Sequence, residues 1–461
     1  MCKRVKDAAG GRTYALGEVR SILSVLRLLV LWDRIRGSFW FMPAVMTAAA
    51  IALSWGVTRL DQALGERVYS GVAVLQLFGA EGARAILSAI ASSMITVAAL
   101  TFSITMLTLQ LASSQFGPRL LRNFMRDRGN QLVLGTFIST FLYCLLVLRT
   151  VKGVEGASFV PHLAVAIGVL LAVASLAVLI FFIHHTAHSI RIETQLAVLA
   201  AETASTIDRL YPERLGQPPS TTGRPLPDND NLEEDDDALA KEARAGFESA
   251  EAIAPDHGGY VQMIDGETLI AEAARRDLVV WIAAPPGAFV TERDALLLIR
   301  PAQASAGELS EEARNALRAA VVIGEERTPE QDLAFSVRRI VEIAQRSLSP
   351  GINDPTTALY CIDRLGQAFV RLADRKPPAS RRFDEAGRLR VLARPVTFET
   401  LTCDAFAAVA RYAGQDTDVL RCLAEALDRV AAATDMSRHP RLAALRLAVR
   451  SRADGGMPQA D

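Results

Sequence analysis

Four long runs of apolar residues dominate the first 190 positions of the chain, and polar or charged stretches separate them. The runs lie at about 38–58, 85–112, 131–148 and 159–183. A helix needs about 20 apolar residues to cross the roughly 30 Å hydrocarbon core of a bilayer, and its backbone hydrogen bonds are satisfied there without water. The pattern therefore predicts a transmembrane domain at 38–190 that contains four helices.

Within these bounds the four runs contain no Asp, Glu, Lys or Arg. Ionisable side chains inside a membrane usually belong to proton relays, ion pathways or voltage sensors. Their absence from the predicted spans weighs against a proton-coupled pump or a voltage sensor, but not against a passive pore.

The stretches that flank the membrane domain differ in charge. Residues 1–37 combine Arg and Lys with Leu and Val, which predicts a basic helix that lies on the cytosolic face of the membrane or packs against the soluble part of the chain. Residues 191–213 predict a helical extension that is continuous with the fourth run. Residues 214–240 are acidic and poor in apolar side chains, which predicts a disordered, solvated linker.

Lys and Arg are distributed unevenly among the loops. They concentrate in residues 1–37 and 113–130, whereas the two intervening loops hold fewer of them. By the positive-inside rule this bias places both termini and the 113–130 loop in the cytoplasm. The scattered cysteines, none in a CxxC pair, agree with a reducing compartment.

The remaining half of the chain predicts a cytosolic region in two parts. Short β-like runs broken by Gly and Pro turns indicate a small β-rich module at 241–305. Apolar spacing near 3.6 residues indicates a helical domain at 306–461, whose first helices we expect at 308–323 and 329–348. The expected fold class is therefore mainly α: a four-helix transmembrane region followed by a cytosolic α+β domain, in which a helical bundle follows the β-rich module.

The second apolar run carries a polar stripe. At 100° per residue, six polar side chains fall within an arc of about 80°. They are Ser88, Ser92, Thr96, Ser103, Gln110 and Ser114. Such a stripe lines a water-filled path, or it lets helices approach closely and hydrogen-bond to one another. Both interpretations stay open, and helix packing is the commoner one.

Three histidines follow the fourth apolar run. His184 and His188 lie four residues apart, so both rings can face one cation. Two imidazoles without further ligands are an incomplete metal site. We therefore expect no metal and no cofactor, and a metal-binding or pH-sensing role for these histidines is the less favoured interpretation.

Two turns in the soluble half are rich in helix-capping residues. In SPGINDP, Pro350 and Gly351 end one helix and Asp354 caps the next. The exposed N–H groups of that next helix can bind an anion. The candidate ligand-binding residues at the two turns are Arg327, Gln331, Asn353 and Asp354. Capping alone is the simpler explanation of these residue types.

Several stretches together resemble a known family. They are SSMITVAALTFSITMLTLQLASSQFGPRLL, GYVQMID, PPGAFV, RTPEQDLAFSVRRIVEIAQRSLSPGINDPTTA and ARPVTFETL. The chain is similar over nearly its whole length to bacterial predicted membrane proteins catalogued as domain of unknown function twenty-two fifty-four. The resemblance implies four spans and a cytosolic domain in the bacterial inner membrane, and it implies no catalytic residue.

These features lead to two hypotheses about function. The first is a homo-oligomeric ion channel or small-solute transporter with a regulatory cytosolic domain. The second is a membrane-anchored ligand-sensing or scaffold protein without transport activity. We do not expect an enzyme, because GxSxG, HExxH and Walker A motifs are missing. The expected partners are the lipid bilayer, further copies of the chain and an anionic ligand on the cytosolic domain, but not nucleic acid, since the net charge is only −1.

Overall fold

A computed structural model of the chain divides into two compact units, Met1–Arg191 and Ile192–Asp461. It describes residues 40–64, 79–116, 127–151, 159–189, 191–211, 247–248, 250–302, 309–375, 377–394 and 396–455. The predicted basic helix at 1–37 and the predicted linker at 214–240 lie outside the described residues. Each unit has its own apolar core.

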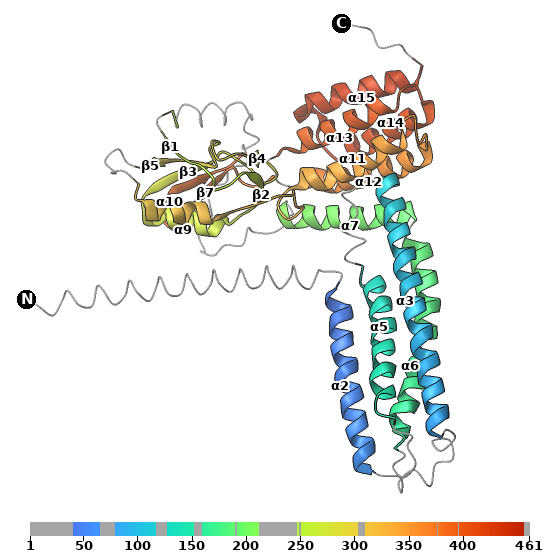
Figure 1. The fold of residues 1–461 in the computed structure, drawn as a ribbon. Coiled ribbons are helices and arrows are strands. Elements are labelled where there is room, and N and C mark those ends of the chain that lie inside the picture. Colours follow the sequence, from blue (N-terminus) through green and yellow to red (C-terminus); the bar gives the residue numbers. More distant parts are fainter. Residues whose placement is uncertain are drawn as a thin grey trace, which may run out of the picture. The chain divides into compact units, whose positions relative to one another are not determined.

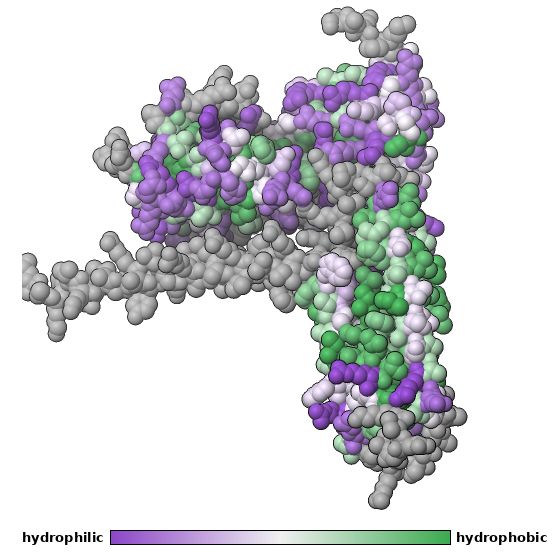
Figure 2. Space-filling view, in the orientation of Figure 1, coloured by the Kyte–Doolittle hydropathy of each residue, from purple (hydrophilic) through white to green (hydrophobic). Residues whose placement is uncertain are grey.

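The first unit consists, as far as it is described, of four long helices (Figure 1). They are α2 (Phe41–Leu64), α3 (Ala80–Phe116), α5 (Arg128–Leu148) and α6 (His162–Ser189). All four are long and apolar enough to cross a membrane. The surface of these helices is mostly hydrophobic along their length in Figure 2. This confirms the expected four-helix membrane region.

Helix α5 occupies the centre of this unit. It packs against α2, α3 and α6, and half of its most apolar stretch is buried, a larger share than in the other three helices. Phe137 and Tyr143 of α5 are among the largest fully buried side chains. Gly135 lets α2 approach closely, because a Cβ there would lie 2.6 Å from the Met46 sulfur. The remaining helices therefore expose much of their surface.

The membrane helices extend beyond the uncharged apolar runs, and in α2 the extension brings a charged residue into the fold. This helix continues past the predicted end at residue 58 and includes Arg59 and Asp61. The Asp61 side chain is buried, at 2% exposure, and accepts hydrogen bonds from the backbone N–H groups of Leu163 (3.2 Å) and Ala164 (3.0 Å). These N–H groups belong to the first turn of α6, which has no acceptors of its own. The first membrane helix thus caps the fourth.

The second unit begins with α7 (Ile192–Leu210). This helix is not the continuous extension of the fourth span that the sequence predicted, because α6 ends at Ser189 and α7 starts after Ile190 and Arg191. Helix α7 is amphipathic, and it packs against α11 (Leu333–Ser347) and α12 (Pro355–Ala373) within the second unit. Its apolar face therefore belongs to the core of the second unit.

Two small sheets make up the β-rich part of the second unit, as far as it is described. The larger has the order β1 (Glu251–Ile253), β5 (Leu297–Pro301), β3 (Leu278–Ile282), β8 (Leu389–Leu392) and β7 (Arg381–Phe383). The smaller has the order β4 (Phe289–Val290), β2 (Gly259–Ile264) and β6 (Val321–Gly324). All pairs are antiparallel except β3 with β8. Helices α9 (Gly266–Arg275) and α10 (Glu311–Ala319) lie beside the sheets (Figure 1) and share one apolar core with them.

The boundary predicted at residue 305 does not separate the sheets from the helices. Strands β6, β7 and β8 come from beyond it, so the helix expected at 308–323 is α10 followed by the strand β6. Val321, Val322 and Ile323 are β-branched and favour a strand. Their spacing nevertheless continues the helical pattern, and pairing with β2 is a long-range event that no local period reveals.

The helical part of the second unit packs around α12. The bundle also includes α13 (Phe398–Tyr412), α14 (Thr417–Ala432) and α15 (Pro440–Ala453). Phe369 of α12 and Phe406 of α13 are fully buried, with ring centroids 5.4 Å apart. Helix α11 begins at Leu333, later than expected, because Asp332 caps it by accepting from the N–H of Phe335.

Candidate functional site

The polar stripe of α3 lies on the exposed side of the helix. Five of its members have described side chains, and all five are exposed in the single chain: Ser88, Ser92, Thr96, Ser103 and Gln110. The side chain of Ser114 lies outside the described residues. The buried side of α3 is formed by other residues, namely Ala83, Leu87, Ala91, Ala98, Thr101 and Thr108. At 100° per residue the two sets point about 160° apart, so among the described residues the stripe does not lie on the face of α3 that packs against other helices.

Three hydroxyl groups of the stripe, those of Ser92, Thr96 and Ser103, donate within α3. Ser92 donates to the carbonyl of Ala89 (3.1 Å), Thr96 to that of Ser92 (2.8 Å) and Ser103 to that of Ala99 (2.9 Å). Each hydroxyl oxygen keeps lone pairs that can accept from an outside donor. These three residues can therefore face water, a second helix or lipid without leaving a hydroxyl donor unpaired.

Large apolar side chains border the stripe on both edges. Ile95 and Phe102 lie along one edge, and Leu100 and Leu107 along the other, and all four are exposed. A row of small polar residues between two rows of large apolar ones gives α3 three distinct outward surfaces. This arrangement suits a helix whose two apolar edges contact neighbouring helices while the polar stripe between them faces water or another polar surface.

The histidines at the end of α6 do not form a metal site. The rings of His184 and His188 lie 4.3 Å apart between centroids, and His188 contacts only the backbone carbonyl of His184 among the polar atoms described near it. The described residues contain no group of three His, Cys, Asp or Glu side chains that could hold a metal ion.

The third histidine, His185, has a partner that sequence spacing did not reveal. Its Nε2 lies 2.7 Å from Oδ2 of Asp127, which also caps α5 by accepting from the N–H of Gly129. Phe181 stacks on the His185 ring. A Cβ at Gly129 would lie 2.5 Å from His185 Nε2, so only glycine fits beneath the ring. This contact joins the start of α5 to the end of α6.

Arg327 and Gln331 form a structural junction before α11. The Arg327 guanidinium donates twice to Oδ2 of Asp332, from Nε at 2.9 Å and Nη2 at 2.6 Å. The Gln331 amide accepts from the N–H of Ile264 and donates to the carbonyl of the same residue. Gly287, at φ +86°, lies against the Arg327–Asp332 ion pair, because a Cβ there would be 2.0 Å from Asp332 Oδ2. Both candidate side chains are thus engaged within the fold.

Asn353 and Asp354 lie at the other end of α11. Asn353 adopts a left-handed conformation (φ 49°) in the turn after that helix. Asp354 caps α12 and accepts from both the N–H and the hydroxyl of Thr357. Helix α11 has 15 residues, about 22 Å at 1.5 Å per residue, and it separates this pair from Arg327 and Gln331. The four candidate residues therefore do not converge on one anion site, and capping accounts for those at the SPGINDP turn.

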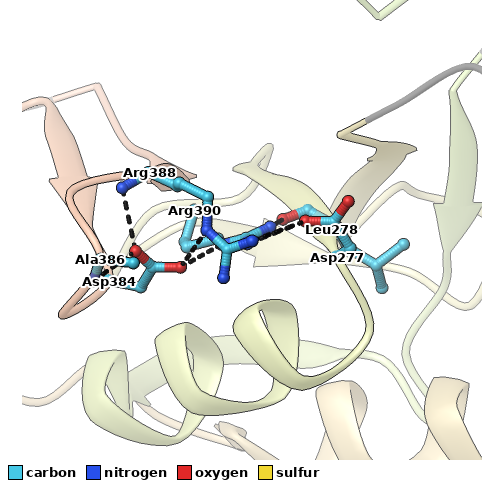
Figure 3. A network of polar contacts seen from close by, with 6 residues as sticks. All are labelled: Asp277, Leu278, Asp384, Ala386, Arg388 and Arg390. Carbon is cyan, nitrogen blue, oxygen red and sulfur yellow. Dashed lines mark hydrogen bonds and ion pairs between the residues drawn. The ribbon is translucent and has the colours of Figure 1, made fainter.

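The most deeply buried charge of the second unit was not predicted from the sequence. Arg390 of β8 is fully buried and forms three bonds (Figure 3). It donates to Asp384 (2.8 Å), to Asp277 (2.9 Å) and to the carbonyl of Leu278 (3.2 Å). Burial alone would raise the pKa of Asp384, but hydrogen bonds from Arg388 and Arg390 and their charges lower the pKa to about 2. The network ties the β7–β8 hairpin to the start of β3.

Ion pairs also hold α7 in the second unit. Glu202 accepts from Arg339 of α11 at 2.8 Å, and the Arg339 side chain is 7% exposed. Asp208 accepts from Arg371 (2.6 Å) and Arg375 (2.7 Å) in the α12 region. Leu196, Leu199 and Ile207 fill the space beneath, and all three are fully buried. These pairs join residues that are more than 130 positions apart, and no local pattern predicts them.

Comparison with known proteins assigns the chain to a family. A family described as "Predicted membrane protein (DUF2254)" matches residues 36–429. Uncharacterized proteins of Mycobacterium bovis and Mycobacterium tuberculosis are each 33% identical over 441 residues, which cover 93% of this chain and 78% of the relative. No solved structure matches this chain.

Proposed function

We propose, on the premise that this chain belongs to the DUF2254 family of predicted membrane proteins, that it is a homo-oligomeric ion channel or small-solute transporter. Helix α3 lines the path in this proposal, and the second unit is a regulatory cytosolic domain. We place the protein in the bacterial inner membrane with both termini in the cytoplasm, on the strength of its Lys and Arg distribution. The proposal assigns no catalytic residue.

One observation carries the proposal, namely that the polar stripe of α3 is exposed and opposite to the packing face of that helix. Polar side chains in a bilayer favour a water-filled cavity or another protein surface over hydrocarbon. Copies of the chain arranged around a symmetry axis turn the same face of α3 toward that axis. Ile95, Phe102, Leu100 and Leu107 then meet the neighbouring copies, and the hydroxyls face the lumen.

The length of the stripe supports a continuous path. From Ser88 to Gln110 it extends about 33 Å at 1.5 Å per residue, which equals the roughly 30 Å thickness of the hydrocarbon core. The polar surface therefore reaches from one interface to the other. A shorter polar patch would serve helix packing as well, but would not supply a path across the membrane.

The first test measures flux through purified protein in proteoliposomes, under applied voltage and under osmotic downshift. The triple variant Ser92→Leu, Thr96→Leu, Ser103→Leu narrows the lumen and makes it apolar, so flux should fall at least tenfold. Ser93→Leu is the matched control, because Ser93 is also exposed and donates to a carbonyl of the same helix, but lies off the stripe. Flux that is absent in the native chain, or equal in both variants, contradicts the proposal.

The second test is the number of copies in the membrane. Native mass spectrometry from lipid nanodiscs should give a closed oligomer with at least three copies, because one or two copies of α3 cannot enclose a lumen. A protein that stays monomeric in nanodiscs contradicts the pore. A membrane-anchored sensor or scaffold is then the function that remains.

A further inference from the structure

Helix α7 is the first element of the second unit and follows the fourth membrane helix directly. Only Ile190 and Arg191 separate Ser189, the last residue of α6, from Ile192, the first residue of α7. A connection of two residues limits the distance between the end of α6 and the start of α7. The position of α7 therefore constrains the end of α6 through the chain itself, whatever the orientation of the two units.

The second unit holds α7 by two kinds of contact. Leu196, Leu199 and Ile207 are buried against the helical bundle, and α7 packs on α11 and α12 (Figure 1). Ion pairs fix its register at two points, with Glu202 on Arg339 and Asp208 on Arg371 and Arg375. Arg209 adds a bond to the carbonyl of Glu330, just before α11.

These contacts make the docking of α7 specific but separable. Two of the buried residues on its docked face, Thr203 and Thr206, are polar, and their hydroxyls donate to carbonyls of α7 itself. These hydrogen bonds therefore persist when α7 separates from α11 and α12. The Glu202–Arg339 pair does not survive, and undocking exposes both charges to water, where each is stable. An interface of this kind opens at a lower cost than an all-apolar core.

We propose that α7 is the coupling helix of the protein, whose docking on α11 and α12 sets the position of α6 and thereby regulates the membrane path. This role rests on the proposed channel or transporter function. Docked α7 holds the end of α6 in one position, and loss of the Glu202–Arg339 pair releases it. Arg339 is a positioning residue in this scheme and touches no permeant species.

Hydrogen–deuterium exchange of the full chain in nanodiscs tests the docking without reference to transport. Peptides that cover 192–211 should exchange slowly in the native protein. Glu202→Gln should speed their exchange about tenfold, because Arg339 is left buried without a charged partner. Asp208→Asn should give a smaller increase, because Asp208 itself and its partner Arg371 are more exposed than Glu202 and Arg339. Glu193→Gln is the matched control on the same helix, since Glu193 is exposed and forms no ion pair among the described residues, and it should change the rate less than about twofold.

Flux in proteoliposomes tests the coupling. The change in flux should follow the same ranking, largest in Glu202→Gln, smaller in Asp208→Asn and absent in Glu193→Gln. Exchange that stays slow in Glu202→Gln overturns the docking. Faster exchange with native flux overturns the coupling and leaves the channel standing. A native chain without flux overturns the channel and the coupling role together. Thermal unfolding of each variant identifies loss of fold, and Asp208→Asn keeps the test available if Glu202→Gln unfolds.

Discussion

Hydroxyls on α3 in the membrane unit donate to carbonyls three or four residues back on the same helix, whereas Arg390 in the soluble unit reaches Asp277, 113 positions away. The difference reflects the two solvents. A polar group in lipid is stabilised by a hydrogen-bond partner within its own helix, because that partner is present wherever the helix forms. In water, an unpaired charge is stable until folding buries it, so its partner can come from anywhere in the chain. The hydroxyls of the α3 stripe thus pair locally, whereas Arg390 is satisfied by tertiary contacts.

Several polar side chains of the membrane unit also pair with distant residues, among them Thr140 with Ser175 and His185 with Asp127. Asp61 is a buried carboxylate whose partners, Leu163 and Ala164, lie over 100 positions away. It satisfies N–H groups at the start of a helix, which have no acceptor within that helix. Asp61 therefore supplies, at a helix end, the acceptors that the helix itself lacks.

The largest effect is expected from Arg390→Met, which removes the central charge of the soluble network. Asp384 stays buried without its main partner, so the free energy of unfolding should fall by about 3–5 kcal/mol. Thermal unfolding of the full chain in detergent measures this, followed by Trp281 fluorescence after the other tryptophans are replaced by Phe. Arg388→Met is the control, because that side chain is 58% exposed, and it should cost less than about 1 kcal/mol. Equal losses in the two variants would contradict the network.

The same network predicts a pH dependence confined to acid. The pKa of Asp384 is about 2 in the folded chain against an ordinary value of 3.8. A carboxyl whose pKa is lowered by folding contributes stability above its ordinary value and loses it as pH falls toward the folded value. Unfolding measured between pH 7 and pH 2 should show a contribution of about 2 kcal/mol that is constant down to about pH 4 and fades below it. Asp384→Asn should lack this acid-dependent part, and an identical pH profile in both proteins would refute the assignment.

A smaller effect is expected from Asp61→Ala, the corresponding change in the membrane unit. Two N–H groups at the start of α6 lose their acceptor, which should cost about 0.5–2 kcal/mol, as for other helix caps. Asp61→Asn keeps one acceptor oxygen and should cost less. Thermal unfolding in detergent separates the two variants. No loss in Asp61→Ala would mean that the cap contributes nothing to the membrane unit.

The smallest effect is expected at Asn353, one of the candidate ligand residues. Its φ of 49° is accessible to Gly and Asn but strained for β-branched residues. Asn353→Gly should therefore change the free energy of unfolding by less than about 0.5 kcal/mol, whereas Asn353→Val should cost about 1–2 kcal/mol. Urea titration of the full chain distinguishes them. A ligand role beyond the turn would instead appear as lost function in Asn353→Gly with unchanged stability.

Much of the architecture could be predicted from local pattern. The four membrane helices follow from runs of apolar residues, and α12 begins at Pro355 as its capping Asp354 indicates. The predicted strand–helix boundary near residue 305 failed, because β6 and β8 are short and pair with distant strands. The four candidate ligand residues do not meet at one site for a related reason. They share a capping chemistry, but α11 holds the two pairs at opposite ends.

What the sequence determined by itself is therefore the number of membrane helices and the polar stripe on α3, since both depend on composition and helical period alone. The tertiary structure alone decided that the stripe faces outward, that Asp61 caps α6, and that Arg327 and Arg390 are bound to specific carboxylates. A helix in lipid satisfies its backbone without help from other segments, so its existence is a local property. The choice of neighbours depends on which surfaces fit together, and that is settled only when the whole chain has packed.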